Sequence, residues 1–206
     1  MAEQQQAQPI VSNDGFNRHA LLFPGILGEQ GEEAVTYHLV DRLNRGTFGE
    51  AWTIKRVSDG QIFAGKIMFL KELSTKQQLR ARTEVSCIRS SAAHFGCVGF
   101  IEDATYEDKL LIVMEYCNAG DLRYQIKHRR DNGMLPFEEH DIKKILLQLV
   151  ISLNWLHRNH ILHRDMKAEN VLLATSGLVK IGDFGMSKEY ESTLTAVAQT
   201  FCGTPA

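Results

Sequence analysis

The sequence has no apolar run as long as the ~18 residues that a membrane-spanning helix needs. Its N-terminus also lacks a basic segment followed by an apolar core, so no secretory signal is expected. The chain also has no large excess of positive or negative charge. The 23 basic and 25 acidic residues give a formal net charge of −2, which gives no support to a nucleic-acid or polyanion binder. We therefore expect an intracellular, cytoplasmic protein without a membrane segment.

Cysteine is scarce, and its spacing shows no metal or disulfide pattern. The four cysteines are Cys87, Cys97, Cys117 and Cys202, and none forms a CxxC pair. A zinc site would need further ligands at close spacing, and the sequence has none. Free thiols in a reducing compartment are the expected state.

The first 35 residues differ in composition from the rest of the chain. They open with the polar, Gln-rich stretch MAEQQQAQP and continue with scattered prolines and glycines. This composition predicts a mostly disordered leader over residues 1–35. Regular structure is expected to begin near Tyr37.

Strand signals dominate the next part of the chain and helix signals the part after it. Short segments rich in β-branched and aromatic residues, separated by turn signals, predict strands over residues 37–43, 50–57, 61–70 and, around a YEDK turn, 100–116. Residues 76–91 read as a helix with Leu79, Val85 and Ile88 near one face. Helices are also expected over 121–130 and 137–159, and a last strand near 178–184. The longest helix has apolar residues three and four apart, namely Ile142, Ile145, Leu146, Leu149, Leu153 and Leu156. This order predicts an α+β fold with a β-rich lobe that contains one helix, followed by an α-rich lobe.

The stretch LNRGTFGEA, Leu43 to Ala51, joins two of the predicted strands. Gly46 and Gly49 would let backbone N–H groups approach a phosphate. A Rossmann turn would open a helix and a P-loop would continue with GK[ST], and neither follows. Asn44 stands where the full glycine pattern has its first glycine, and asparagine tolerates positive φ better than most residues. A plain hairpin turn explains this stretch equally well.

Lys66 lies in the middle of the apolar strand segment FAGKIMF. Its side chain either reaches solvent or has an acidic partner. Glu84, on the predicted helix, could be that partner and would leave the ammonium near phosphates. Glu72 is an alternative.

The stretch ILHRDMKAENVLL, residues 161–173, sets polar groups directly before an apolar strand. Asp165 could accept a hydroxyl proton, Lys167 could neutralise phosphoryl charge, and Asn170 offers an oxygen to Mg²⁺. Asp183, in IGDFG, could supply a second metal-binding oxygen. Taken singly, the first stretch could be an ordinary loop whose polar groups cap one another, and IGDFG could be a strand end followed by a turn.

Together, the glycine loop, Lys66, Glu84, MEY, HRDMKAEN, DFG and GTP occur in one order with consistent separations. From Tyr37 to its last residue, the chain resembles a eukaryotic protein kinase. Lys167, two residues after Asp165, and Thr204 in the GTP segment resemble the residues of serine/threonine kinases at these positions, rather than those of tyrosine kinases. VMEYCNAGDL and QTFCGTP resemble the NIMA-related kinases.

The resemblance implies the following roles. Lys66, paired with Glu84, would hold the ATP phosphates under the loop that contains Asn44, Gly46 and Gly49. Asp165 would be the catalytic base, Lys167 a γ-phosphate contact, and Asn170 and Asp183 the Mg²⁺ ligands. The adenosine would be contacted by Leu43, Ala51, Ala64, Met114 as gatekeeper, Glu115 and Cys117 through their backbones, Asp121 at the ribose, and Leu172. Ile88, His163 and Phe184 match the internal hydrophobic spine of the family.

Arg164 precedes the catalytic base, where such an arginine usually binds a phosphate on the activation segment. Thr200 stands four residues before Thr204, the spacing of an activating phosphothreonine, and Ser192, Thr193 and Thr195 are alternatives.

Beyond the leader predicted over residues 1–35, the resemblance implies a kinase N-lobe over 36–117 and part of a C-lobe over 118–206. The sequence stops at GTPA, before the APE motif and the helices that follow it in the family. We therefore expect a fragment that folds poorly alone, because large apolar side chains of the 137–159 helix lack packing partners. Its phosphotransfer is expected to be weak or absent. The expected function is ATP- and Mg²⁺-dependent transfer to a serine or threonine of a protein substrate. The alternative is a non-catalytic nucleotide-binding or scaffold module.

Overall fold

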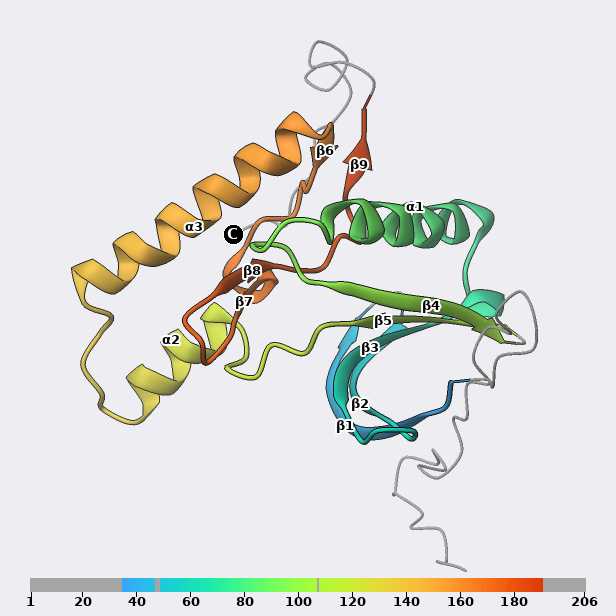
Figure 1. The fold of residues 1–206 in the computed structure, drawn as a ribbon, viewed down its shortest axis with the longest axis horizontal. Helices are drawn as coiled ribbons and strands as arrows, with labels where there is room; N and C mark the ends of the chain where they lie inside the picture. The colour runs from blue at the N-terminus through green and yellow to red at the C-terminus, as the bar shows by residue number, and fades with distance from the viewer. Residues whose placement is uncertain (1–34, 47–48, 107, 191–206) are drawn as a thin grey trace, which may run out of the picture. The chain divides into compact units, whose positions relative to one another are not determined.

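A computed structural model describes residues 35–46, 49–106 and 108–190 (Figure 1). The predicted leader up to residue 34 and the chain beyond 190 lie outside the described residues. The described chain groups into two compact units. The first runs to Lys71 and includes Asp103–Val113, and the second contains Glu72–Glu102 and the described residues from Met114 onward. The predicted lobe boundary at residue 117 remains a prediction.

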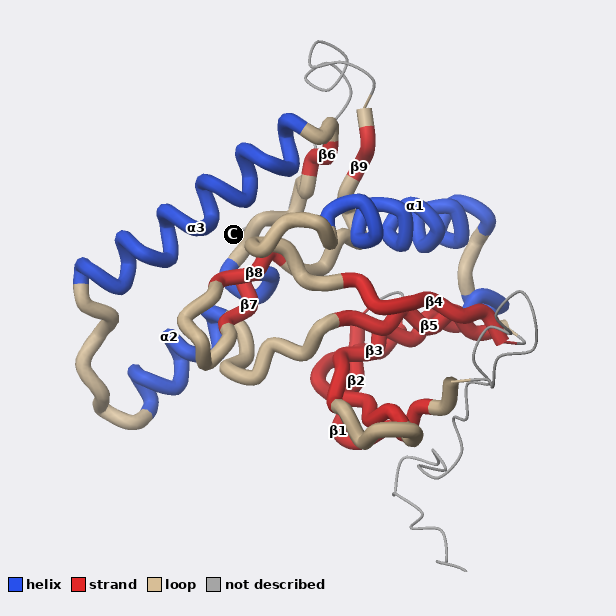
Figure 2. The backbone as a smooth tube through the Cα atoms, in the orientation of Figure 1, coloured by secondary structure: helices blue, strands red, loops and turns tan. Residues whose placement is uncertain are grey.

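The first unit is built on a five-stranded sheet of order β1-β2-β3-β5-β4 (Figure 2). β1 pairs antiparallel with β2, and β2 with β3. The five predicted strand segments are confirmed, with bounds β1 (Tyr37–Gly46), β2 (Gly49–Arg56), β3 (Ile62–Phe69), β4 (Phe100–Tyr106) and β5 (Lys109–Met114).

One face of this sheet carries the core of the first unit. Alternation along β2 and β3 sends every second side chain to the same face. The buried cluster contains Tyr37, Trp52, Ile54, Phe63, Ile67, Leu111 and Val113. The rings of Tyr37 and Phe63 meet edge to face at 6.0 Å. This packing fixes β3, so that Ala64 and Lys66 alternate with the buried Phe63 and Ile67.

The second unit contains the helices and two short strand pairs. The helices are α1 (Thr75–Ser91), α2 (Leu122–Asp131) and α3 (Glu139–Arg158), with 3₁₀ turns η1 (Leu70–Glu72, which starts in the first unit) and η2 (Ala168–Asn170). The strands are β6 (Ile161–Leu162), β7 (Val171–Leu173), β8 (Val179–Ile181) and β9 (Lys188–Glu189). β6 pairs with β9 and β7 with β8. α3 packs against β6 and β8, α2 against η2 and β7, and α1 contacts β9.

The buried face of α1 differs from the predicted one. Leu79 is exposed and Val85 only half-buried, so that assignment was wrong, whereas Ile88 is fully buried as expected. The buried positions of α1 are Ala81, Glu84, Cys87, Ile88 and Ser91. Most residues of this face are small or polar, so the spacing of large apolar residues along the sequence does not reveal it.

α3 keeps much of its apolar face exposed. Ser152 and Leu156 are its only buried residues, while Ile142 and Leu146 are 53% and 57% exposed. This agrees with the expectation that these side chains lack packing partners.

The expected thiol state is confirmed for the described cysteines. Cys87, Cys97 and Cys117 are free, buried thiols, and Cys202 lies outside the described residues. In the part of the chain that the structure describes, no helix is long and apolar enough to cross a bilayer.

Candidate active site

The β7–β8 hairpin brings the two predicted metal ligands to one end of a strand pair. Its antiparallel register pairs Val171 with Ile181 and Leu173 with Val179. One step further along, Asn170 faces Gly182, and the Gly182 N–H donates to the Asn170 carbonyl at 2.9 Å. Asp183 follows Gly182 directly. The apolar side chains of the hairpin are Val171, Leu172, Leu173, Val179 and Ile181, and the polar residues Asn170 and Asp183 flank its end.

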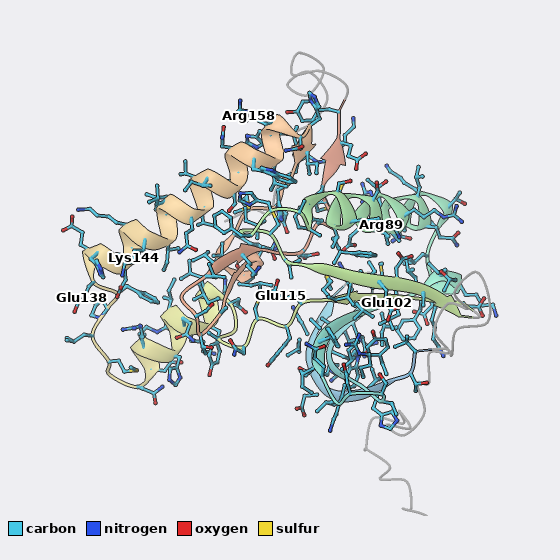
Figure 3. All side chains as sticks on the ribbon, in the orientation of Figure 1. Arg89, Glu102, Glu115, Glu138, Lys144 and Arg158 are labelled. Atoms are coloured by element: carbon cyan, nitrogen blue, oxygen red, sulfur yellow. The ribbon has the colours of Figure 1, made fainter. Side chains whose placement is uncertain are left out.

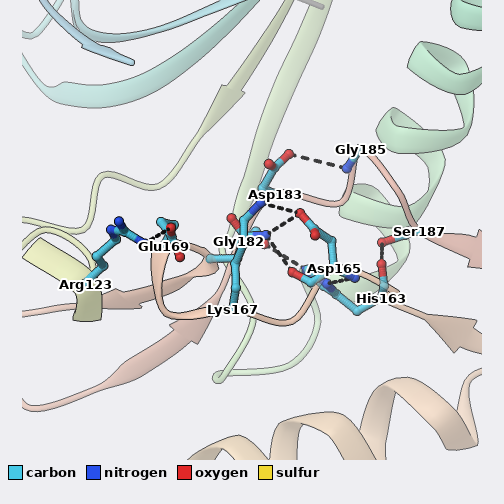
Figure 4. A network of polar contacts seen from close by, with 10 residues as sticks. Arg123, His163, Asp165, Lys167, Glu169, Gly182, Asp183, Gly185 and Ser187 are labelled. Carbon is cyan, nitrogen blue, oxygen red and sulfur yellow. Dashed lines mark hydrogen bonds and ion pairs between the residues drawn. The ribbon is translucent and has the colours of Figure 1, made fainter. Parts of the chain in front are cut away.

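Asp165, Lys167 and Asn170 form one polar network, and Figure 4 labels Asp165 and Lys167 within it. Lys167 Nζ lies 2.8 Å from Asp165 Oδ2. Asn170 Nδ2 donates to the Asp165 carbonyl at 2.7 Å and to Oδ2 at 3.0 Å. Asp165 and Asn170 are both buried. The hydrogen bond with Asp165 raises the pKa of Lys167, so this lysine stays charged beside the carboxylate.

The orientation of the Asn170 amide follows from these two bonds. Its nitrogen is committed to Asp165, so its side-chain oxygen is the atom left to meet a cation.

His163 and Phe184 support the network from the buried side. Their rings lie 5.1 Å apart, and both side chains are almost completely buried. His163 Nε2 donates to the Gly182 carbonyl at 2.8 Å, just before Asp183. Burial lowers the pKa of His163, although that hydrogen bond and the nearby Asp183 and Asp165 act in the opposite direction.

Two site residues have left-handed backbone conformations. Arg164 has φ 63° and Asp183 φ 54°. Such conformations in residues other than glycine cost ~1–3 kcal/mol and gather at functional sites. Arg164 Nε donates to the Met186 carbonyl at 2.6 Å, which ties the residue before Asp165 to the segment after Asp183. Thr200, its predicted phosphorylated partner, lies outside the described residues.

Residues 114–121 and Leu172 carry the predicted adenosine contacts of the second unit. The Glu115 N–H donates to the Gly99 carbonyl at 2.9 Å, so its own carbonyl is the group left for a base. Cys117 is buried and Met114 half-buried. Asp121 caps α2 by accepting from the Tyr124 N–H at 2.7 Å, and it forms an isolated bridge with Leu172.

The remaining predicted contacts lie in the first unit. Leu43 and Asn44 are exposed on β1, and Asn44 does not need the positive φ considered for it. Gly49 has φ 153°, and a Cβ there would approach the Ile67 carbonyl oxygen at 2.0 Å, so this position requires glycine. Ala51 pairs with Lys66 across β2 and β3. The further predicted residues of this unit are Gly46 at the end of β1 and Ala64 on β3.

Glu84 is buried on α1 in the second unit. Its predicted pairing with Lys66 remains a prediction.

The sequence reasoning missed two charged residues near the network. Arg123 of α2 forms an ion pair with Glu169 at 2.8 Å, which joins α2 to η2. Lys180 on β8 is a buried lysine paired with Glu115. The sequence signal for this pair is the position of Lys180 between Val179 and Ile181, because a lysine in a buried strand needs a partner.

The comparison with known families places the chain in one of them. Residues 37–206 match the protein kinase domain. The chain belongs to the protein kinase domain family.

Relatives of the chain include proteins named serine/threonine kinases. The chain is 40% identical over 185 residues to Putative serine/threonine-protein kinase A of Trypanosoma brucei brucei, covering 89% of this chain and 43% of the relative. It is 33% identical over 178 residues to Serine/threonine-protein kinase Nek9 of Mus musculus, covering 86% of this chain and 18% of the relative. Serine/threonine-protein kinase Nek1 of the same organism is 33% identical over 169 residues, covering 82% and 14%. These relatives confirm the predicted resemblance to serine/threonine and NIMA-related kinases. The chain spans less than half of their length.

Proposed function

We propose that this chain is the ATP- and Mg²⁺-using part of a serine/threonine protein kinase. The observation that carries the proposal is the network in which Lys167 and Asn170 hold the carboxylate of Asp165, beside the hairpin end that carries Asp183. The kinase relatives support the same reaction class.

The proposed reaction is phosphoryl transfer to a hydroxyl group. Asp165 orients the substrate hydroxyl and accepts its proton, with its Oδ2 held in place by two neighbours. The hydroxyl oxygen bonds to the γ-phosphorus, the bond from that phosphorus to the bridging oxygen breaks, and ADP leaves. Lys167 keeps its charge beside Asp165 and stabilises the negative charge on the moving phosphoryl group.

The residues present fit magnesium as a partner of ATP. Asn170 and Asp183 offer oxygen atoms, which Mg²⁺ prefers, and Mg²⁺ is commonly held by one or two protein groups plus phosphates and water. No group of three His, Cys, Asp or Glu side chains among the residues described here could hold a metal by itself. Mg²⁺ supplies charge neutralisation of the phosphates when bound.

We also propose the remaining roles that the family resemblance implies. Lys66 with Glu84 holds the phosphates, and Glu115 and Cys117 read the base through their backbones. Arg164 binds a phosphate on Thr200 in the regulated state. The partner is a protein with an accessible serine or threonine.

A non-catalytic nucleotide-binding module is the second candidate. The presence of Lys66, Asp165 and Asp183 weighs against it, because a binding module does not need a catalytic base.

Transfer of label from γ-labelled ATP to a generic Ser/Thr protein separates the two candidates. We expect label in the serine and threonine of the substrate with the wild-type chain, and at least a ~10²-fold loss with Asp165→Asn, the usual contribution of a general base. Both proteins should bind Mg·ATP equally, because Asp165→Asn keeps the shape of the side chain. Binding without any Asp165-dependent transfer favours the non-catalytic module.

A further inference from the structure

Lys180 is a buried lysine that none of the roles above uses. It lies on β8, three residues before Asp183, and its side chain is only 9% exposed. Its Nζ lies 2.8 Å from Glu115 Oε2, 2.9 Å from the Phe95 carbonyl and 3.5 Å from the Cys97 carbonyl. An ammonium group has three N–H donors, and these three acceptors match them. A buried ammonium is costly unless it is paired and hydrogen-bonded in this way.

The carboxylate of Glu115 is the main partner of Lys180 and has a second contact. Its Oε2 also accepts the Gly99 N–H at 3.1 Å, while the Glu115 N–H donates to the Gly99 carbonyl at 2.9 Å. A Cβ on Gly99 would stand 3.2 Å from that same Oε2, so the two residues lie in close contact. Glu115, which Figure 3 labels, is therefore fixed through its side chain and its backbone at once.

β8 itself is fixed to the same loop by backbone bonds. The Ile181 N–H donates to the Gly96 carbonyl at 2.8 Å, and the Val98 N–H donates to the Ile181 carbonyl at 3.0 Å. Lys180 therefore projects from an anchored strand and ties the 95–99 loop to the segment that begins at Glu115.

We propose that Lys180 is a positioning residue that sets base specificity by fixing the backbone carbonyl of Glu115. This inference rests on the proposed nucleotide binding. A carbonyl accepts hydrogen bonds. The adenine edge presents an amino donor at the position where guanine presents a carbonyl oxygen. A carbonyl held in one place by Lys180 favours adenine over guanine, whereas contacts to ribose and phosphates do not discriminate between the two nucleotides.

The ratio of the dissociation constants of ATP and GTP tests this role. The constants are measured by displacement of a fluorescent nucleotide from the purified chain. For Lys180→Met we expect the Kd for ATP to rise by roughly five- to tenfold, the factor that one lost hydrogen bond gives. The Kd for GTP should stay nearly unchanged, so the preference for ATP falls. A purely structural role would weaken both nucleotides by the same factor and leave the ratio unchanged.

Two further variants make the result decisive. Lys144→Met makes the same substitution at an exposed lysine of α3 and should leave the ratio at its wild-type value. Glu115→Gln keeps the size of the side chain but removes the charge that pairs with Lys180. It should lower the ratio in the same direction and serves as the test if Lys180→Met does not fold. An unchanged ratio in both Lys180→Met and Glu115→Gln overturns the proposal.

Amide hydrogen exchange separates this proposal from the proposed function. Lys180→Met or Glu115→Gln should speed exchange in residues 95–99 and 115–117 and leave α3 unchanged. If the wild-type chain binds neither nucleotide, the proposed function fails, and faster exchange would still show that Lys180 holds the segment. Exchange that is unchanged in these residues contradicts the positioning role directly.

Discussion

At the scale of single residues, two histidines of the second unit are buried in their neutral form. Burial lowers the pKa of His163, and burial together with the charge of Lys180 lowers that of His94. His163 Nε2 donates to the Gly182 carbonyl, and His94 Nδ1 accepts the Gly96 N–H at 3.1 Å. Each ring therefore uses the neutral imidazole, and His94 would lose its acceptor on protonation.

These shifts predict that stability decreases as the pH falls. In the unfolded chain both histidines bind protons near their ordinary pKa of about 6.5, whereas in the folded chain they resist protonation. Below that value the unfolded state holds more protons, so the free energy of unfolding falls with pH. The slope is at most about 1.4 kcal/mol per pH unit for each histidine. Urea unfolding between pH 7.5 and 5.5 measures it.

The matched comparison is the same titration on His94→Gln and His163→Gln. Each variant should have a flatter pH dependence than the wild type, whatever its absolute stability. A wild-type free energy of unfolding that stays constant or rises down to pH 5.5 contradicts the assignment.

At the scale of elements, the loop between α1 and β4 sits very close to α3. A Cβ on Gly96 would approach Ser152 Oγ at 1.8 Å and Ser152 Cβ at 3.0 Å. Ser152 is completely buried, and the rings of His94 and Trp155 stack at 5.2 Å beside it. This packing anchors the loop whose Phe95 and Cys97 carbonyls accept hydrogen bonds from Lys180.

Gly96→Ala should therefore destabilise the chain by overpacking, by about 1–3 kcal/mol. Ser152→Gly alone should cost about 1 kcal/mol, because glycine is unfavourable within a helix. The double variant should be less destabilised than the sum of the two, because removal of the serine side chain makes room for the alanine methyl. A double-mutant cycle by urea unfolding measures this coupling, and strict additivity would rule out the contact as the cause.

Most elements could be predicted from the sequence, because their signals are local. The strands up to Met114 and the three helices follow from alternation, helical spacing and turn residues. The two-residue strands β6 and β9 could not be predicted, because they exist only through their pairing with each other. The buried face of α1 was also missed, since it depends on Ala81, Glu84 and Ser91 rather than on large apolar residues.

The candidate site likewise contains residues that local motifs reveal and long-range contacts that they do not. Asp165, Lys167, Asn170 and Asp183 lie close together in the chain or at the ends of one hairpin, so their motifs pointed to them. The ties of Lys180 to Glu115 and of Arg123 to Glu169 join residues 65 and 46 positions apart, taken as 180 − 115 and 169 − 123, and no local pattern reports them.

At the scale of the whole molecule, each unit carries a share of the proposed nucleotide ligands. Lys66 belongs to the first unit and Asp183 to the second. The exposed apolar face of α3 shows that the second unit leaves a large apolar helix face unpacked, yet its hairpin and polar network are formed. The proposed function requires that Lys66 and Asp183 both take part in binding Mg·ATP.

The melting temperature of the purified chain with and without Mg·ATP tests this claim most directly. A ligand that binds only the folded state raises stability by RT ln(1 + [L]/Kd), or about 2.7 kcal/mol at a hundredfold excess over Kd. We predict a clear rise for the wild-type chain and for Lys55→Met, which changes an exposed lysine of β2. The rise should disappear in Lys66→Met and in Asp183→Ala. No cooperative melt, no shift in the wild type, or an equal shift in all four proteins would contradict the account.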